Sequence, residues 1–293
     1  MSNDDYLREA LRAHEVQPDS TEMKDLQAAR AEIEELIRSH FDDCGPTIRY
    51  GGSKAKGTMN LEEYDLDIIV YFPRTDTAAG SSIKEIYENV QSALETRYIV
   101  DPKTTALRVK NNERDLRIDV VPGRFVDEKT VDAYVHQNGG SKKYLMTNLD
   151  THIEHIRDSG FVPEVRLTKL WRPCAGIEVR TFPLELVVVK ILKRSAPNGL
   201  SARLMHVLTT IRDEIETIAL EDPANSGNDL SEALSADVRQ RMALAARSTV
   251  QSVERGGWSS VFDRVAKGSA AERDVARRVS IISSPSRPQP WRI

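Results

Sequence analysis

The chain has 293 residues, 40% of them hydrophobic and 29% charged, a composition typical of a globular protein with one large domain or two lobes. Its formal net charge is −4, which argues against long duplex nucleic acid as a partner, because proteins that bind duplexes usually carry a basic domain. The sequence has no apolar run of membrane-spanning length and no signal-peptide pattern at its start. Cys44 and Cys174 are the only cysteines, too few for a disulfide framework or a four-thiolate zinc site, and we expect a cytoplasmic protein.

Helical and strand patterns alternate in the first third of the chain. Apolar residues at helical spacing predict a helix between Glu22 and Phe41. A short β-prone run, Thr47–Tyr50, leads into the sequence Gly-Gly-Ser at 51–53. Residues 65–72 (DLDIIVYF) are rich in β-branched and aromatic side chains and predict a strand that ends before Pro73.

The pattern continues with a helix and two strands. The helix is expected from about Ser82, which stands at capping-box spacing from Glu85. Strands are expected at 106–110 and 116–121, joined by a polar turn at 111–114.

Helical spacing dominates beyond Gly123, with few strand signals. It is found in the segments 148–158, 183–194, 200–220 and 229–266. We therefore predict an α/β (α+β) lobe with a mixed sheet over residues 1–130, including an N-terminal helix. A helical lobe is expected over 131–293, with an extended tail from about 283.

Three aspartates fall on the predicted strands in a pattern that favours one shared site. Side chains alternate between the faces of a strand, so Asp65 and Asp67 project to one side while Leu66 projects to the other. In 116–121, likewise, Asp119 lies opposite the apolar residues. If the two strands are neighbours, the three carboxylates converge on one surface patch.

Three carboxylates so close together repel one another unless cations compensate their charge. Mg²⁺ prefers oxygen ligands at about 2.1 Å and keeps positions open for water and phosphate. We therefore expect two Mg²⁺ ions at Asp65, Asp67 and Asp119, for which Mn²⁺ can substitute.

The Gly-Gly-Ser sequence lies between a strand and the predicted metal strand. Backbone N–H groups at Gly52 and the hydroxyl of Ser53 are suited to binding phosphate oxygens. Taken alone, such a sequence is more often an ordinary turn. Lys56, close behind it, is interpreted as a surface charge, and the helical pair His152 and His155 as surface residues.

The order of these motifs carries a resemblance. Gly-Gly-Ser, an eleven-residue gap, DLD on one strand and RIDVVP on a later one resemble the nucleotidyltransferase superfamily of DNA polymerase beta. Downstream, 166–171 (RLTKLW), 181–186 (TFPLEL) and 222–229 (DPANSGND) resemble segments of oligoadenylate synthases and CCA-adding enzymes. Together they are similar to bacterial CD-NTases, the relatives of cyclic GMP-AMP synthase in CBASS anti-phage defence.

The resemblance implies a two-lobed enzyme with its active site in a cleft between the lobes. Asp65 and Asp67 would hold both metals, and Asp119 would complete the acceptor-side metal. Gly52 and Ser53 would bind the donor triphosphate from one lobe. Lys169 and Thr181 would contact it from the other.

The implied reaction joins ribonucleoside triphosphates into a cyclic di- or trinucleotide and releases pyrophosphate. The implied substrates are ATP together with GTP, CTP or UTP. The product would be a second messenger that diffuses to a downstream effector. An alternative is a polymerising enzyme that makes linear oligoadenylate or extends an RNA end. The non-enzymatic alternative is a catalytically silent interaction or antitoxin module.

Overall fold

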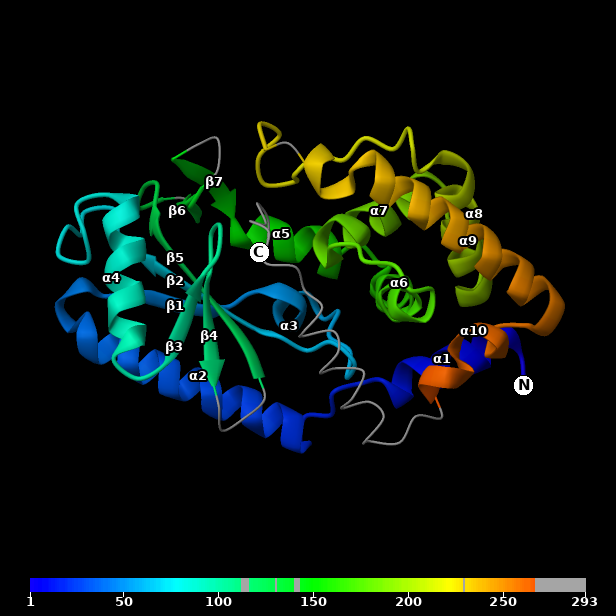
Figure 1. Ribbon diagram of the computed structural model, residues 1–293, viewed down its shortest axis with the longest axis horizontal. Coiled ribbons are helices and arrows are strands. Elements are labelled where there is room, and N and C mark those ends of the chain that lie inside the picture. The colour runs from blue at the N-terminus through cyan, green and yellow to red at the C-terminus, as the bar shows by residue number, and fades with distance from the viewer. Residues whose placement is uncertain (112–115, 130, 140–142, 229, 267–293) are drawn as a thin grey trace.

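The computed structural model describes residues 1–111, 116–129, 131–139, 143–228 and 230–266. The expected turn at 111–114 therefore lies almost wholly outside the described residues, and the expected tail from 283 lies entirely outside them. In the described chain a lobe built on a β-sheet stands beside a lobe of helices (Figure 1). No described helix is both long and apolar enough to cross a membrane.

The elements follow one another along the chain as helices, strands and short 3-10 turns. Their bounds are α1 Asn3–Ala13, α2 Thr21–His40, η1 Asp42–Cys44, β1 Thr47–Tyr50, α3 Gly52–Lys56, β2 Leu66–Phe72, α4 Ile83–Glu95, β3 Ile99–Pro102, β4 Leu107–Asn111, β5 Leu116–Phe125, β6 Asp132–His136, β7 Tyr144–Asn148, α5 Leu149–Arg157, α6 Val162–Cys174, α7 Thr181–Arg194, α8 Leu200–Glu214, η2 Ser231–Leu234, α9 Ala236–Gly256 and α10 Ser259–Ala266.

Local signals in the sequence place the first helices well. The Ser20 hydroxyl accepts a hydrogen bond from the Met23 N–H at 3.2 Å and caps α2. Ser82 caps α4 in the same way, accepting from the Glu85 N–H at 3.2 Å. The Glu85 carboxylate, however, accepts from the backbone N–H of Ser81 at 2.8 Å, so the predicted capping box is only half formed.

The sheet is mixed. The strand order is β1-β2-β5-β4-β3, with β6 paired to β5 and β7 paired to β6. The pair β2–β5 is parallel and the other pairs are antiparallel. The expectation of few strands beyond Gly123 is wrong for β6 and β7, which extend the sheet to Asn148. Each has five residues whose burial alternates with period two, so a strand signal was present in the sequence and the prediction overlooked it.

Both faces of the central strands are buried. On one face, Leu66, Ile68 and Val70 of β2 pack with Ile118 of β5 against α2 and α4, as the alternation predicts. The opposite face carries a smaller cluster formed with β6, β7 and α5. Asp67 and Asp119 project toward this second face, because they alternate with the residues of the first.

The helical lobe has its own core, and α1 belongs to it. Leu7 and Leu11 of α1 pack among the apolar residues of α6 to α10. In Figure 1, α1 accordingly lies with the helical lobe, whereas α2 runs along the sheet. Trp171 of α6 is fully buried in this core, and its Nε1 donates to the Thr249 hydroxyl at 2.8 Å.

Candidate active site

The parallel pairing of β2 and β5 brings two of the three aspartates together. Asp67 and Asp119 are direct register partners, and neighbouring strands lie about 4.8 Å apart. Asp65 directly precedes β2, two residues before Asp67. The expectation that the two strands are neighbours is therefore confirmed.

Asp119 is paired with an arginine that the sequence analysis did not assign to the site. Arg108 lies opposite Asp119 on β4, and its Nε and Nη2 each donate to one carboxylate oxygen at 2.8 Å. Asp119 is only 1% exposed, so the expectation that it lies on a surface patch is wrong. Burial is tolerated because a bidentate guanidinium both pairs and hydrogen-bonds the charge.

A second arginine compensates Asp65. Nη1 of Arg117 lies 3.4 Å from Oδ2 of Asp65, whose side chain is 21% exposed. Strand alternation puts Arg108 on the face away from Leu107 and Val109, but the sequence does not give the register that sets it against Asp119.

Gly52 lies directly against the Asp67 carboxylate. A Cβ added to Gly52 would stand 1.6 Å from Oδ2 of Asp67, and the residue has φ +54°, in the left-handed region. The backbone N–H of Gly51 donates to the Asp67 carbonyl at 2.9 Å. The Gly-Gly-Ser segment is therefore packed against the first residues of β2, which an ordinary exposed turn would not require.

Helix α3 is tied to the helical lobe by a buried ion cluster. Nζ of Lys56 lies 2.5 Å from Oε2 of Glu185 on α7. The hydroxyl of Thr58 donates to Oε1 of Glu185 at 2.8 Å. Nζ of Lys169 on α6 donates to the Thr58 carbonyl at 2.8 Å and lies 3.7 Å from Oε1 of Glu185. All four residues are buried, so the interpretation of Lys56 as a surface charge is wrong.

The charges of this cluster favour ionised Glu185. Burial acts to raise the pKa of Glu185, but Lys56 and Lys169 outweigh it and hold that pKa below its usual value. Burial lowers the pKa of Lys169, which Glu185 only partly offsets. One buried carboxylate thus serves two cations, and the cluster depends on it more than on either lysine.

Ser53 and Thr181 stand at the starts of the two helices that this cluster joins. Ser53 is the second residue of α3, Thr181 is the first residue of α7, and both are half-buried. Glu185 follows Thr181 by one helical turn, so its bond to Lys56 brings the start of α7 close to α3. The triphosphate contacts of Ser53, Thr181 and Lys169 stay predictions.

The segment 222–228 is held in place by a buried carboxylate. Oδ1 of Asp222 lies 2.6 Å from Nε2 of His152, and Oδ2 accepts from Asn228 at 2.7 Å. Burial acts to raise the pKa of Asp222, but these hydrogen bonds outweigh it and lower that pKa. His152 is 3% exposed, so its interpretation as a surface residue is wrong.

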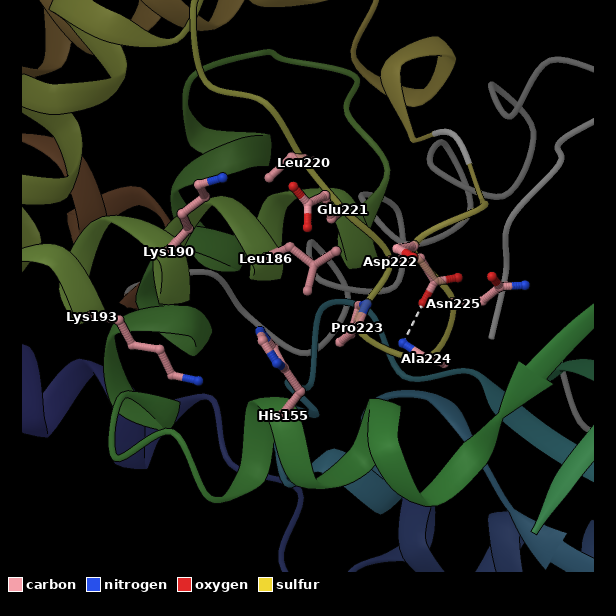
Figure 2. Close-up of a pocket in the computed structure, with 11 residues that line it drawn as sticks. His155, Leu186, Lys190, Lys193, Leu220, Glu221, Asp222, Pro223, Ala224 and Asn225 are labelled. Carbon is pink, nitrogen blue, oxygen red and sulfur yellow. Dashed lines mark hydrogen bonds between the residues drawn. The ribbon is translucent and has the colours of Figure 1, made fainter. Parts of the chain in front are cut away.

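A pocket of about 640 Å³ lies beside this segment. Figure 2 shows His155 from α5 and Lys190 and Lys193 from α7 around it, facing the chain at 220–226. The Asp222 carboxylate on its wall is already bonded, including to the Ala224 N–H at 2.9 Å (dashed line in Figure 2). The lining residues do not include the three aspartates, so this pocket is separate from the candidate active site.

The aspartates suit a hard divalent cation by their donor chemistry. A carboxylate pair offers about eight lone-pair positions, of which Arg108 occupies two on Asp119. Among the described residues, no three His, Cys, Asp or Glu side chains are already grouped to hold one ion. Arginines compensate the charge of Asp119 and Asp65 instead. The two-metal site at Asp65, Asp67 and Asp119 stays a prediction.

Solved structures show the same architecture. CdnC of E. coli MS115-1 with ATP superposes with a TM-score of 0.71 at 16% identity, over 91% of this chain and 99% of that one. The CD-NTase CdnG of Bradyrhizobium diazoefficiens with GTP gives 0.67 at 14% identity, over 94% and 99%. DncV cyclic AMP-GMP synthase of Vibrio cholerae gives 0.62 at 16% identity, over 89% and 85%.

This chain has the CD-NTase fold. The resemblance seen in its motifs is thereby confirmed at the level of the fold, including the mixed sheet and the helical lobe. No protein-family model matches the chain, and no curated protein matches it by sequence.

Gly52→Ala tests the contact between the Gly-Gly-Ser segment and Asp67. A Cβ at Gly52 would collide with the carboxylate, whereas one at Gly57, also in the left-handed region with φ +73°, would have no atom within 4 Å. Gly57→Ala should therefore lower the free energy of unfolding by only about 1–2 kcal/mol, the strain of placing an alanine in the left-handed region. Gly52→Ala should lower the free energy of unfolding, measured in urea, by about 1–3 kcal/mol more than Gly57→Ala does. Equal costs would show that Gly52 does not pack against Asp67.

Glu185→Gln tests the buried ion cluster. It leaves two buried lysines without a carboxylate and should lower the free energy of unfolding by about 3–5 kcal/mol. Lys169→Met is the matched comparison: it keeps the closer Lys56–Glu185 pair and removes the donor to the Thr58 carbonyl and the more distant cation at 3.7 Å from Glu185, at about 1–3 kcal/mol. Urea unfolding at pH 7 measures both. A larger loss for Lys169→Met would contradict the central place of Glu185.

Proposed function

We propose that this protein is a nucleotidyltransferase that joins ribonucleoside triphosphates and releases pyrophosphate. The observation that carries the proposal is the parallel register of Asp67 with Asp119, with Gly52 packed against Asp67. This places two acidic side chains and a glycine-rich backbone segment at one point of the sheet. The CD-NTase fold supports it, since the superposed DncV is a cyclic AMP-GMP synthase.

The proposed step is attack by a ribose hydroxyl on the α-phosphate of a nucleoside triphosphate, with pyrophosphate as the leaving group. Two Mg²⁺ ions, when bound by Asp65, Asp67 and Asp119, would stabilise the attacking and leaving oxygens. Arg108 pairs with the charge of Asp119 and fixes its orientation through both oxygens. Asp119, oriented in this way, would help to accept the proton of the attacking hydroxyl.

Positioning of the triphosphate is assigned to both lobes. Ser53 and the backbone of Gly52 would bind it from α3, and Thr181 would bind it from the start of α7. Lys169 already donates one of its three ammonium N–H groups to the Thr58 carbonyl at 2.8 Å, and another would bind a phosphate oxygen. Because the ion cluster joins α3 to α7, both sets of contacts are preorganised before substrate binds.

We further propose that the product is a cyclic di- or trinucleotide that acts as a second messenger in anti-phage defence and binds a downstream effector. ATP and GTP are the proposed first substrates, because CdnC and CdnG with the same fold were solved with them. The alternative enzyme would instead make a linear oligoadenylate or extend an RNA end. A protein without any such activity would support the alternative of a catalytically silent interaction or antitoxin module.

Asp67→Asn should reduce turnover by at least about 100-fold, because it removes a ligand charge while preserving the side-chain shape. Asp101→Asn is the matched control. Asp101 stands opposite Arg108 on the edge strand β3, pairs with Lys103 and is 43% exposed, so its loss should leave turnover within about twofold. Pyrophosphate release with ATP, GTP and Mg²⁺ measures both variants. Wild-type turnover by Asp67→Asn would refute the assignment.

A cyclic product should survive phosphatase, because it has no terminal phosphate, whereas unreacted triphosphates and linear intermediates lose theirs. The protein is incubated with all four ribonucleoside triphosphates and Mg²⁺ or Mn²⁺, treated with phosphatase and analysed by mass spectrometry. We expect a resistant species of two or three nucleotides. A ladder of linear products would favour the oligoadenylate alternative, and a requirement for added duplex would contradict the charge argument.

A further inference from the structure

A second pocket, of about 950 Å³, lies at the other end of the sheet from the aspartates. The start of α4, the end of β5 and strands β6 and β7 form its walls. Strand β5 passes from Asp119 to Phe125 on the pocket wall in six residues, which span about 20 Å. The pocket is therefore distinct from the candidate active site.

Four cations line this pocket: Arg74, Lys84, Arg124 and Lys143. No Asp or Glu is among its lining residues in the described chain, although the whole protein carries a net charge of −4. Two acidic side chains lie close to the pocket without lining it: Glu88, and Glu85, whose carboxylate accepts from the N–H and the hydroxyl of Ser81. Lys84 forms an exposed ion pair with Glu88, and such a pair compensates the charge of the lysine only weakly.

Two of the cations are unpaired. Neither Arg74 nor Lys143 forms an ion pair with a carboxylate of the described residues, and both are exposed. Arg124, by contrast, is fixed in the wall, because its guanidinium donates to the carbonyls of Gly80 and Ser81. Ser81, Ser82 and Ile83 bring the N-terminus of the 13-residue helix α4 to the pocket, where the helix dipole adds to the attraction for an anion.

Aromatic rings form the rest of the wall. Tyr134 and Tyr144 meet edge to face with their centroids 5.0 Å apart, and both line the pocket with Phe125. Tyr144 is 51% exposed, so one large ring offers its surface to a ligand. Cations beside exposed rings are suited to a molecule that carries both phosphates and a planar base.

We propose that this pocket binds a nucleoside phosphate as a ligand separate from the substrates of the candidate active site. Arg74, Lys84 and Lys143 bind its phosphates, and Tyr144 packs against its base. The volume is that of a small-molecule site, and the acidic balance of the chain argues against a long nucleic acid as the occupant. The proposal goes beyond the nucleotidyltransferase reaction and does not depend on it.

Binding of fluorescent ATP to the full-length protein without divalent metal tests this site, because the candidate active site then lacks its ions. The double variant R74Q/K143Q should raise the Kd at least about 10-fold, since it removes two unpaired cations and no internal contact. R247Q/R255Q is the matched control. It removes two exposed arginines from α9, in the other lobe, with the same change of net charge, and should leave the Kd within about twofold.

Tripolyphosphate serves as a second probe, by competition, and separates the base from the phosphates. Tyr144→Leu should raise the Kd for ATP about fivefold or more and leave the Kd for tripolyphosphate unchanged. Absence of metal-free ATP binding, or wild-type binding by R74Q/K143Q, would overturn the proposal. Equal weakening of both probes by Tyr144→Leu would overturn the base contact. A single-stranded RNA 20-mer that binds more tightly than ATP and is lost in R74Q/K143Q would instead assign the pocket to nucleic acid.

Because the measurement needs neither metal nor turnover, its failure would leave the proposed reaction untouched. Conversely, a protein that binds ATP in this way but has no turnover would support the proposed pocket and contradict the proposed reaction.

Discussion

Glu185 lies 1% exposed between the ammonium groups of two lysines, and a carboxylate so deeply buried is tolerated only with such partners. Its partner Lys56 ends α3, and α3 begins at Gly52, which abuts the Asp67 carboxylate. The position of the candidate catalytic acid is thereby linked to the position of α7. A shift of the helical lobe relative to the sheet must move α3 or break a buried ion pair, and movement of α3 would displace Gly52 against Asp67.

A row of charged side chains crosses the sheet at the same level. Asp67, Asp119, Arg108 and Asp101 are successive register partners on β2, β5, β4 and β3. Two acids stand side by side where the strands are parallel, and a bidentate arginine follows on the next strand. Arg108 therefore compensates the burial of the Asp119 carboxylate through two hydrogen bonds. A cation bound at Asp67 and Asp119 would share the carboxylate with Arg108.

The two ends of β5 carry opposite chemistry. Asp119 stands near its start beside other acids, whereas Arg124 near its end belongs to a pocket lined by cations. The net charge of −4 averages over both and hides the separation. This separation of charge is consistent with the metal site proposed at one end of the sheet and the phosphate site proposed at the other.

Much of the lobe built on the sheet follows from the sequence by itself, because its signals are local. Alternation in residues 65–72 and 116–121 fixed which side chains enter the core and which face Asp67 and Asp119 share, and Ser20 and Ser82 fixed the starts of α2 and α4. The motif order also indicated the fold that the superpositions confirm.

Only the tertiary structure decided which residues meet across the chain. The short strands β6 and β7 alternate in burial with period two, but only tertiary pairing joins β6 to β5 and β7 to β6. The partners Arg108 with Asp119, Lys56 with Glu185 and His152 with Asp222 are separated by 11, 129 and 70 residues. Side-chain type reveals that a lysine or histidine can be charged, but burial and register determine whether it meets water or a carboxylate.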